Sequence, residues 1–161
     1  MRSAPIETTP ADAASERLYW EDFPAGMVRE FGSVTMTRED IIRFATEFDP
    51  QPFHIDEAAA GQTMFGGLIA SGWHTACAAM RMMCDAYLLR SSSLGSPGME
   101  NLNWLKPVRP GDTLRMRLTV LESRPLRSRP GVGLMRGQHE VINQHGEVVM
   151  EMRGSGMFGR K

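Results

Sequence analysis

Apolar and polar residues alternate most regularly in the second half of the chain. Between residues 113 and 121 every second side chain is apolar, the pattern of a strand with one buried face: Leu114, Met116, Leu118 and Val120. Segments 99–106, 133–143 and 147–157 are similar. Gln144-His145-Gly146 between the last two predicts a hairpin turn. The pattern therefore predicts a run of long antiparallel strands.

The first half of the chain predicts short elements of both kinds. Residues 18–23 are interpreted as a short extended piece, and residues 27–36 as a strand. Thr37 suits a helix N-cap with Asp40 three residues on, so a helix is expected over 38–47. Pro50 disfavours helical geometry in the residue before it. The two prolines in 49–56 predict a stiff, extended loop, followed by a helical turn over 56–62.

One long helix is expected from near Ser71 to about Arg90. A stripe at spacings of three and four predicts its core-facing side: Trp73, Ala76, Cys77, Met80, Cys84, Tyr87 and Leu88. Its flanks are also small or apolar. We therefore expect this helix to be buried around most of its circumference.

Together these elements predict an α+β fold in which a curved antiparallel sheet wraps around one long helix. One sheet over one helix leaves an open edge, so we expect a homodimer. Residues 1–16 lack apolar periodicity and are interpreted as a flexible tail, which leaves 17–161 as a single domain.

Composition agrees with a globular protein. The chain has 161 residues, of which 42% are hydrophobic and 23% charged. No apolar run approaches the roughly 18–20 residues of a membrane span, and no secretory signal is evident, so a cytoplasmic location is expected. Cys77 and Cys84 are about two helical turns apart, too far for a disulfide. They are interpreted as packed thiols, and no zinc-ligand spacing occurs.

Charge is distributed unevenly along the chain. The first sixty residues hold twelve acidic and five basic residues, whereas 106–136 hold eight basic and two acidic ones. One interpretation is a solvated strand face; the other is an anionic partner, for which a small phosphorylated molecule fits better than nucleic acid. Arginine, which forks onto phosphates and carboxylates, supplies most of the cations. The candidates for such contacts are Lys106, Arg109, Arg115 and Arg117.

Asp49 and His54 are the candidates for acid–base chemistry. A carboxylate and an imidazole that face one gap can remove one proton and supply another, as water addition or elimination requires. The alternative is that Asp49 caps a turn and His54 packs. The other three histidines, His74, His139 and His145, are interpreted as structural or solvated.

The segment that leads into the long helix suggests a second feature. Free N–H groups at a helix start carry partial positive charge, and glycine at position 72 lets a substrate carbonyl approach the backbone. This predicts an oxyanion site for a thioester whose oxygen becomes enolate-like. The alternatives are that Gly72 serves a tight helix–sheet contact and that Ser71 is only an N-cap.

Three segments in the same order resemble one known family. Asp49-Pro50-Gln51-Pro52-Phe53-His54 is similar to the D-x-N-P-L-H signature of the MaoC-like dehydratases, the (R)-specific enoyl-CoA hydratase family. The stretch 65–72 resembles that family's entry to the central helix, and 105–114 its "P-V-x-x-G-D-x-L" strand entry. The resemblance covers about residues 18–158 and implies the hot-dog fold, usually dimeric.

The resemblance implies roles for particular residues. Asp49 and His54 match the catalytic pair that activates one water, and Gly72 matches the glycine whose amide polarises the thioester carbonyl. Gln51 stands where asparagine is usual, Ser71 replaces a histidine, and Met80 occupies a position where some members have serine. Since some relatives act on branched or carboxylated acyl groups, these departures leave the acyl group open.

We therefore expect a hydro-lyase that reversibly hydrates a 2-enoyl-CoA to a 3-hydroxyacyl-CoA. No metal and no cofactor are expected, because coenzyme A is part of the substrate, and neither nucleic acid nor a membrane is expected as a partner. A hot-dog thioesterase, for which Asp85 would be the only acid on the central helix, and a non-catalytic acyl-CoA or acyl-carrier binding subunit remain alternatives. Six residues are expected to contact substrate: Gln51, Phe53, Ser71, Trp73, Arg109 and Arg115.

Overall fold

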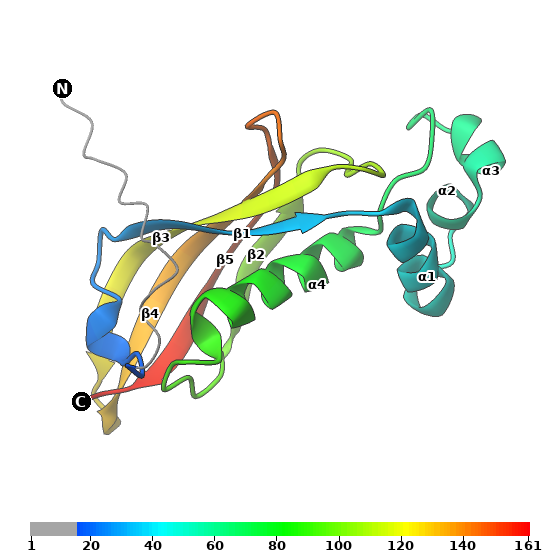
Figure 1. Ribbon diagram of the computed structural model, residues 1–161. Helices are drawn as coiled ribbons and strands as arrows, with labels where there is room; N and C mark the ends of the chain where they lie inside the picture. The colour runs from blue at the N-terminus through cyan, green and yellow to red at the C-terminus, as the bar shows by residue number, and fades with distance from the viewer. Residues whose placement is uncertain (1–15) are drawn as a thin grey trace.

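The computed structural model describes residues 16–161, so the predicted tail lies outside the described residues except for Glu16. Five strands form one antiparallel sheet in the order β1-β3-β4-β5-β2 (Figure 1). The strands are β1 (Val28–Thr35), β2 (Gly98–Trp104), β3 (Thr113–Leu126), β4 (Arg129–Ile142) and β5 (Val148–Gly159). The strands predicted in the second half of the chain are confirmed.

The alternation in β3 gives the sheet its buried face. Leu114, Met116 and Leu118 are fully buried, whereas the arginines between them lie on the other face. β4 and β5 are joined by the predicted hairpin, in which Gly146 has φ +77°. Such a positive φ suits glycine, and this explains its place in the turn.

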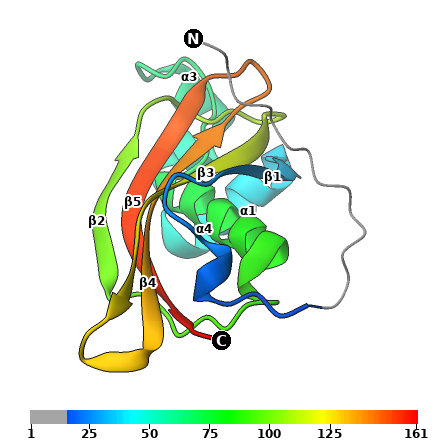
Figure 2. The ribbon, with the colours of Figure 1, turned by 90° about the vertical axis from the view of Figure 1, so that its left-hand side faces the viewer.

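The central helix lies along the concave side of the sheet (Figure 2). It consists of α4 (Gly72–Met83), which continues as a π-helical turn η2 (Cys84–Leu88). Ala79 and Met82 of α4 pack in one core cluster with buried residues of β3 and β5. The predicted architecture, an antiparallel sheet wrapped around a long helix, is confirmed.

The predicted core-facing stripe of this helix is correct only in part: Tyr87 is buried, and Ala76 and Leu88 pack against the core clusters, but three other members face outward. Trp73 and Met80 are 59% and 50% exposed and Cys77 is exposed, whereas Thr75, Ala79 and Met82 face the core. The expected burial around most of the circumference is wrong for the same reason. Because the helix is apolar on more than one side, periodicity alone does not tell which side meets the sheet. Cys77 and Cys84 are free, but Cys77 is not packed.

The first helices lie beyond one end of the sheet, next to the start of α4 (Figure 1). They are α1 (Arg38–Phe48), α2 (Pro52–Ile55) and α3 (Glu57–Gly61). The N-cap at Thr37 is confirmed, since its side chain accepts a hydrogen bond from the Asp40 amide. Among residues 16–161, no helix is both long and apolar enough to cross a bilayer.

Two segments predicted as extended are helical. Trp20–Asp22 forms a 3-10 helix η1, because the Asp22 carboxylate accepts the Tyr19 amide across the turn. Within 49–56, Pro52–Ile55 forms the single turn α2. Pro52 occupies the first helical position, where proline's fixed φ favours a helix and its missing N–H costs nothing. The sequence prediction took Pro50 and Pro52 together as the mark of a stiff, extended loop.

Candidate active site

Asp49 is placed by the end of α1. Its amide donates to the Ala45 carbonyl, so it is the last residue held by the helix, and Pro50 then turns the chain away. The Gln51 amide donates back to the Asp49 carbonyl at 2.8 Å. This tight turn fixes the carboxylate next to the single helical turn that carries His54.

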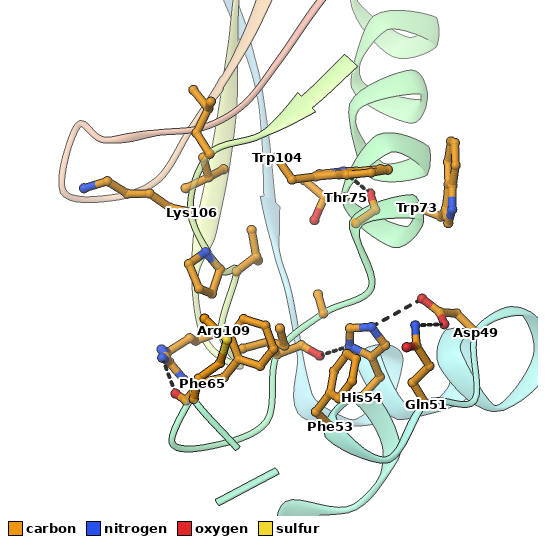
Figure 3. A pocket seen from close by; sticks show the side chains of 18 residues that line it. Asp49, Gln51, Phe53, His54, Phe65, Trp73, Thr75, Trp104, Lys106 and Arg109 are labelled. Atoms are coloured by element: carbon orange, nitrogen blue, oxygen red, sulfur yellow. Dashed lines mark hydrogen bonds and ion pairs between the residues drawn. The ribbon is translucent and has the colours of Figure 1, made fainter. Parts of the chain in front are cut away.

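His54 is buried, and its ring is oriented by the backbone. Nδ1 lies 2.8 Å from the Ile69 carbonyl oxygen. Because a carbonyl only accepts, Nδ1 carries the hydrogen and donates it. Nε2 therefore points the other way, 3.3 Å from Asp49 Oδ2 (Figure 3). The structure brings the two predicted residues together, with one imidazole nitrogen available for proton transfer.

Two further side chains hold the Asp49 carboxylate. Gln51 Nε2 donates to Oδ1 and Ser71 Oγ donates to Oδ2, each at 2.7 Å. The pKa of Asp49 lies below its ordinary value, chiefly because of the Ser71 hydrogen bond, with Gln51 and the charge of His54 adding to it against the opposing effect of burial. Asp49 is thus favoured in its ionised form.

Gly72 begins α4 at the same place. Within residues 16–161 its amide has no hydrogen-bond acceptor, so this N–H at the helix start is free for a ligand. Its carbonyl accepts the indole N–H of Trp104 at 2.9 Å, and a Cβ at position 72 would come within 2.4 Å of the Trp104 ring. Close packing against Trp104 therefore requires glycine at this position.

These groups border a cavity of about 630 Å³. Asp49 and His54 lie at one end of it, and Lys106 and Arg109 at the other (Figure 3). The walls between them are mainly apolar. They come from the α3–α4 connection, the start of α4, the end of β2 and the segment after it: Met64, Phe65, Ile69, Trp73, Trp104, Leu105, Pro107 and Val108. A polar reacting end and a long apolar wall suit an acyl chain.

The other predicted contact residues divide into three groups. Gln51, Phe53, Trp73 and Arg109 line the cavity. Ser71 has no exposed surface and bonds to Asp49 instead; it also caps α4 by accepting the Trp73 amide. Arg115 lies outside the cavity, where its guanidinium pairs with Glu30.

Most of the basic segment is paired on the surface. Arg117 shares Glu30 with Arg115, and Lys106 pairs with Glu147. Arg109, which lines the cavity as Lys106 does, differs in having no carboxylate partner for its guanidinium among the described residues; its Nη2 donates to the Phe65 carbonyl at 2.6 Å. For the strand arginines the structure favours the solvated-face interpretation.

Trp104 and Thr75 are two of the lining residues that sequence reasoning missed. Trp104 lies 32 residues from Gly72 in the sequence, so no local spacing connects them; its position directly before the 105–114 motif is the one signal that could have found it. Thr75 is 2% exposed and lies one turn after Gly72. The predicted stripe, which was built from apolar residues at spacings of three and four, omitted Thr75 because threonine does not count as apolar.

The remaining histidines lie away from the reacting pair. His74 stacks on Phe44 of α1 at 4.7 Å, His139 is buried beside Tyr87, and His145 is exposed in the β4–β5 turn. Asp85 is exposed and pairs with Arg81, outside the cavity lining. No group of three or more metal-ligating side chains occurs in the part of the chain that the structure describes.

Comparison with known proteins identifies a family. The family model described as MaoC like domain matches residues 22–141. The uncharacterized protein YdeM of Bacillus subtilis is 33% identical over 112 residues, which cover 70% of this chain and 79% of that protein. The 3-hydroxybutyryl-CoA dehydratase of Methylorubrum extorquens is 29% identical over 140 residues, covering 84% of each.

A solved structure agrees with these matches. The MaoC-like dehydratase from Rhodospirillum rubrum is 39% identical, with a TM-score of 0.82 over 89% of this chain and 98% of that one. Such similarity in both sequence and backbone confirms the predicted hot-dog fold. The matched region of the family model contains Asp49, His54 and Gly72.

Proposed function

Because this chain belongs to the MaoC-like dehydratase family, we propose that it hydrates a 2-enoyl-CoA reversibly to a 3-hydroxyacyl-CoA. The observation that carries the proposal is the 3.3 Å approach of His54 Nε2 to Asp49 Oδ2 in the cavity wall, beside the free Gly72 amide. The relative named 3-hydroxybutyryl-CoA dehydratase supports a thioester of coenzyme A as the substrate.

In the proposed reaction the Gly72 N–H donates a hydrogen bond to the thioester carbonyl. A water held between Asp49 and His54 attacks the β-carbon, and a C–O bond forms as one water proton passes to the Asp49 carboxylate. The double-bond electrons move to the α-carbon and the carbonyl oxygen, where the partial positive charge of the helix start stabilises the enolate.

Asp49 passes the water's proton across 3.3 Å to His54 Nε2, the unprotonated nitrogen of the neutral ring. His54 completes the reaction by giving this proton from Nε2 to the α-carbon, so that both side chains regain their starting states. The product contains one added water, and dehydration follows the same path in reverse. This assignment uses Nε2 because Nδ1 is engaged with the Ile69 carbonyl.

Arg109 and Lys106 are proposed to meet the anionic part of coenzyme A at the far end of the cavity. Arginine binds phosphate oxygens through paired N–H groups, and both residues lie at the opposite end from the reacting pair. No cofactor or metal is part of the proposal, because backbone and side-chain donors supply the polarisation.

The test is the hydration of crotonyl-CoA and of longer and branched enoyl-CoAs, followed as loss of the conjugated thioester's ultraviolet absorbance. Asp49→Asn and His54→Ala should each lower kcat/KM by about 10²–10⁴-fold, the usual contribution of general acid–base catalysis. Asp85→Asn and His145→Ala are matched controls, since both remove the same group types from exposed positions outside the cavity. Full turnover in both active-site variants would contradict the assignment.

Product analysis separates the alternatives. A hydroxyacyl thioester supports the hydratase, release of free thiol indicates a thioesterase, and binding of acyl-CoA without conversion indicates a binding subunit.

We also propose that the chain forms a homodimer. Trp73, Cys77 and Met80 form an apolar strip on the outer side of α4. Among residues 16–161, β2 is an edge strand that pairs only with β5. Trp73 and Trp104, at the end of β2, lie in edge contact at 5.2 Å, so strip and edge form one continuous surface. A second copy would cover both.

A further inference from the structure

Ser71 connects two parts of the candidate site that are distant in the sequence. Its hydroxyl donates to Asp49 Oδ2 at 2.7 Å and accepts the Trp73 amide at 3.3 Å. The residue is fully buried. One oxygen atom therefore ties the carboxylate at the end of α1 to the first turn of the helix whose Gly72 amide faces the cavity.

The position of Asp49 makes these donors necessary. It follows the last residue of α1, where the helix dipole presents its negative end and disfavours a carboxylate. Gln51 Nε2 supplies the only side-chain hydrogen bond to Oδ1 among the described residues. Removing Ser71 would leave Oδ2 with His54 alone.

The charged groups around Asp49 are few. His54 of α2 faces it directly, and the first turn of α4 carries no acidic residue. Lys106 and Arg109, on the segment after β2, lie at the opposite end of the cavity and are engaged with Glu147 and the Phe65 carbonyl. Hydrogen bonds rather than a neighbouring arginine or lysine therefore hold this carboxylate.

We propose that Ser71, assisted by Gln51, is a positioning residue that holds Asp49 ionised and fixes its orientation relative to His54 and the Gly72 amide. The proposal rests on the proposed function, because it assigns to Asp49 the role of accepting a proton from water. The role of Ser71 thus differs from the substrate contact expected of it from the sequence. Met80, the position at which some relatives have serine, is half exposed, and its thioether has no hydrogen to donate to Asp49.

The test compares wild type with Ser71→Ala by two measurements. Loss of a hydrogen bond to a charged acceptor should raise the pKa of Asp49 by about one unit. NMR titration of carbon-13-labelled aspartate carboxyls measures this pKa. The acid limb of kcat/KM should move to higher pH by the same amount. At neutral pH, loss of orientation should lower kcat by about tenfold with little change in KM.

Two controls separate positioning from helix capping. Thr37 caps α1 in the same manner: its hydroxyl accepts the Asp40 amide and donates to the Asp40 carboxylate at 2.8 Å. Thr37→Ala should lower the free energy of unfolding by about as much as Ser71→Ala does, and it should leave the pKa of Asp49 unchanged. Ser71→Gly keeps an acceptable N-cap residue but lacks the donor, so it should repeat the pKa rise even where Ser71→Ala folds poorly.

The outcomes are distinguishable. A raised Asp49 pKa in Ser71→Ala or Ser71→Gly, absent in Thr37→Ala, supports the positioning role. An unchanged Asp49 titration in a folded Ser71 variant overturns it, whatever the loss of stability. A wild-type protein that hydrates no enoyl thioester overturns the proposed function instead, while the NMR titration still decides whether Ser71 holds the carboxylate.

Discussion

Tyr87 and His139 form a buried polar pair near the C-terminal end of the central helix, away from the cavity. The Tyr87 hydroxyl lies 3.2 Å from His139 Nε2, and His139 Nδ1 has no partner among the described residues. Burial lowers the pKa of His139 to about 4, since protonation would place a charge among aromatic and aliphatic side chains. His139 is therefore neutral in the folded protein at ordinary pH.

This burial predicts a pH-dependent stability. Between pH 6.5 and 4 the unfolded chain binds a proton at His139 that the folded protein does not, so folding stability falls as pH falls through that window. The loss from this residue should total about 3 kcal/mol. Urea unfolding at pH 7 and pH 4 measures this loss in the wild type and in His139→Phe. Because phenylalanine cannot titrate, the free energy of unfolding of the variant should fall by less between the two pH values.

His74 contributes to the pH dependence of stability as well. Burial lowers its pKa as well, so it acts in the same direction, and the two proteins must be compared rather than the wild type described alone. Loss of the Tyr87 partner in His139→Phe is an offset that does not depend on pH. Parallel stability curves for the two proteins would contradict the prediction.

At the residue scale, the sequence identified groups that are close together in the chain. Asp49 and His54 are five positions apart, so spacing and motif were enough to pair them. Ser71 contacts Asp49 across 22 residues and Trp104 contacts Gly72 across 32, through tertiary contacts that join α4 to the end of α1 and to β2. Local pattern carries no signal for such contacts. The same limit applies to Arg115, whose guanidinium pairs with Glu30 of β1 and does not reach the cavity.

Among the elements, β1 contains an irregularity that lets α4 approach it. The register with β3 shifts between Phe31 and Val34, and Gly32 within this bulge has φ +78°. A Cβ at Gly32 would come within 2.5–2.9 Å of the Met82 side chain. Both the conformation and the space therefore require glycine.

Gly32→Ala should lower the free energy of unfolding by about 2–4 kcal/mol, combining backbone strain with displacement of Met82. Gly26→Ala is the matched control, because Gly26 has φ +87° but a Cβ added there would meet no atom within 4 Å. The control should lose about 1 kcal/mol from strain alone. Equal losses in urea unfolding would show that the contact with Met82 contributes nothing.

Elements with a regular period were predictable, and those that depend on context were not. The strands of the second half and α1 follow from alternation and capping. α2 escaped prediction because Pro52 both prevents a helix from continuing into it and favours a helix that starts with it. The buried side of α4 was not predicted correctly because the outer side of the helix is also apolar. The reason for that apolar outer side lies in the surface of the whole molecule.

At the scale of the molecule, the single chain leaves a large apolar surface uncovered. The exposed fractions of Trp73, Met80 and Trp104 are 59%, 50% and 47%. Isolated exposed apolar residues are ordinary, but a contiguous set beside an unpaired strand edge marks an interaction surface. This surface explains why the long helix has an apolar pattern that the sheet alone does not require.

Pairing of two chains through this surface gives the last prediction. The wild-type protein should sediment with about twice the chain mass of 17.9 kDa at micromolar concentration. Met80→Glu places a charge on the apolar strip, where burial against a second copy would cost several kcal/mol, so this variant should be monomeric. Met80 is chosen because it does not line the cavity.

Leu121→Glu provides the comparison, since Leu121 is 40% exposed on β3 rather than on α4 or β2. It should remain dimeric, because its charge stays in solvent. If Met80→Glu and Leu121→Glu have the same mass as the wild type, the strip is not the interface. If the wild type itself is monomeric, the apolar side of α4 has another occupant, and the expected dimer is wrong. If Met80→Glu breaks the dimer and Leu121→Glu does not, the apolar residues on the outer face of α4 are explained by burial against a second copy. The apolar residues on its inner face are explained by burial against the sheet.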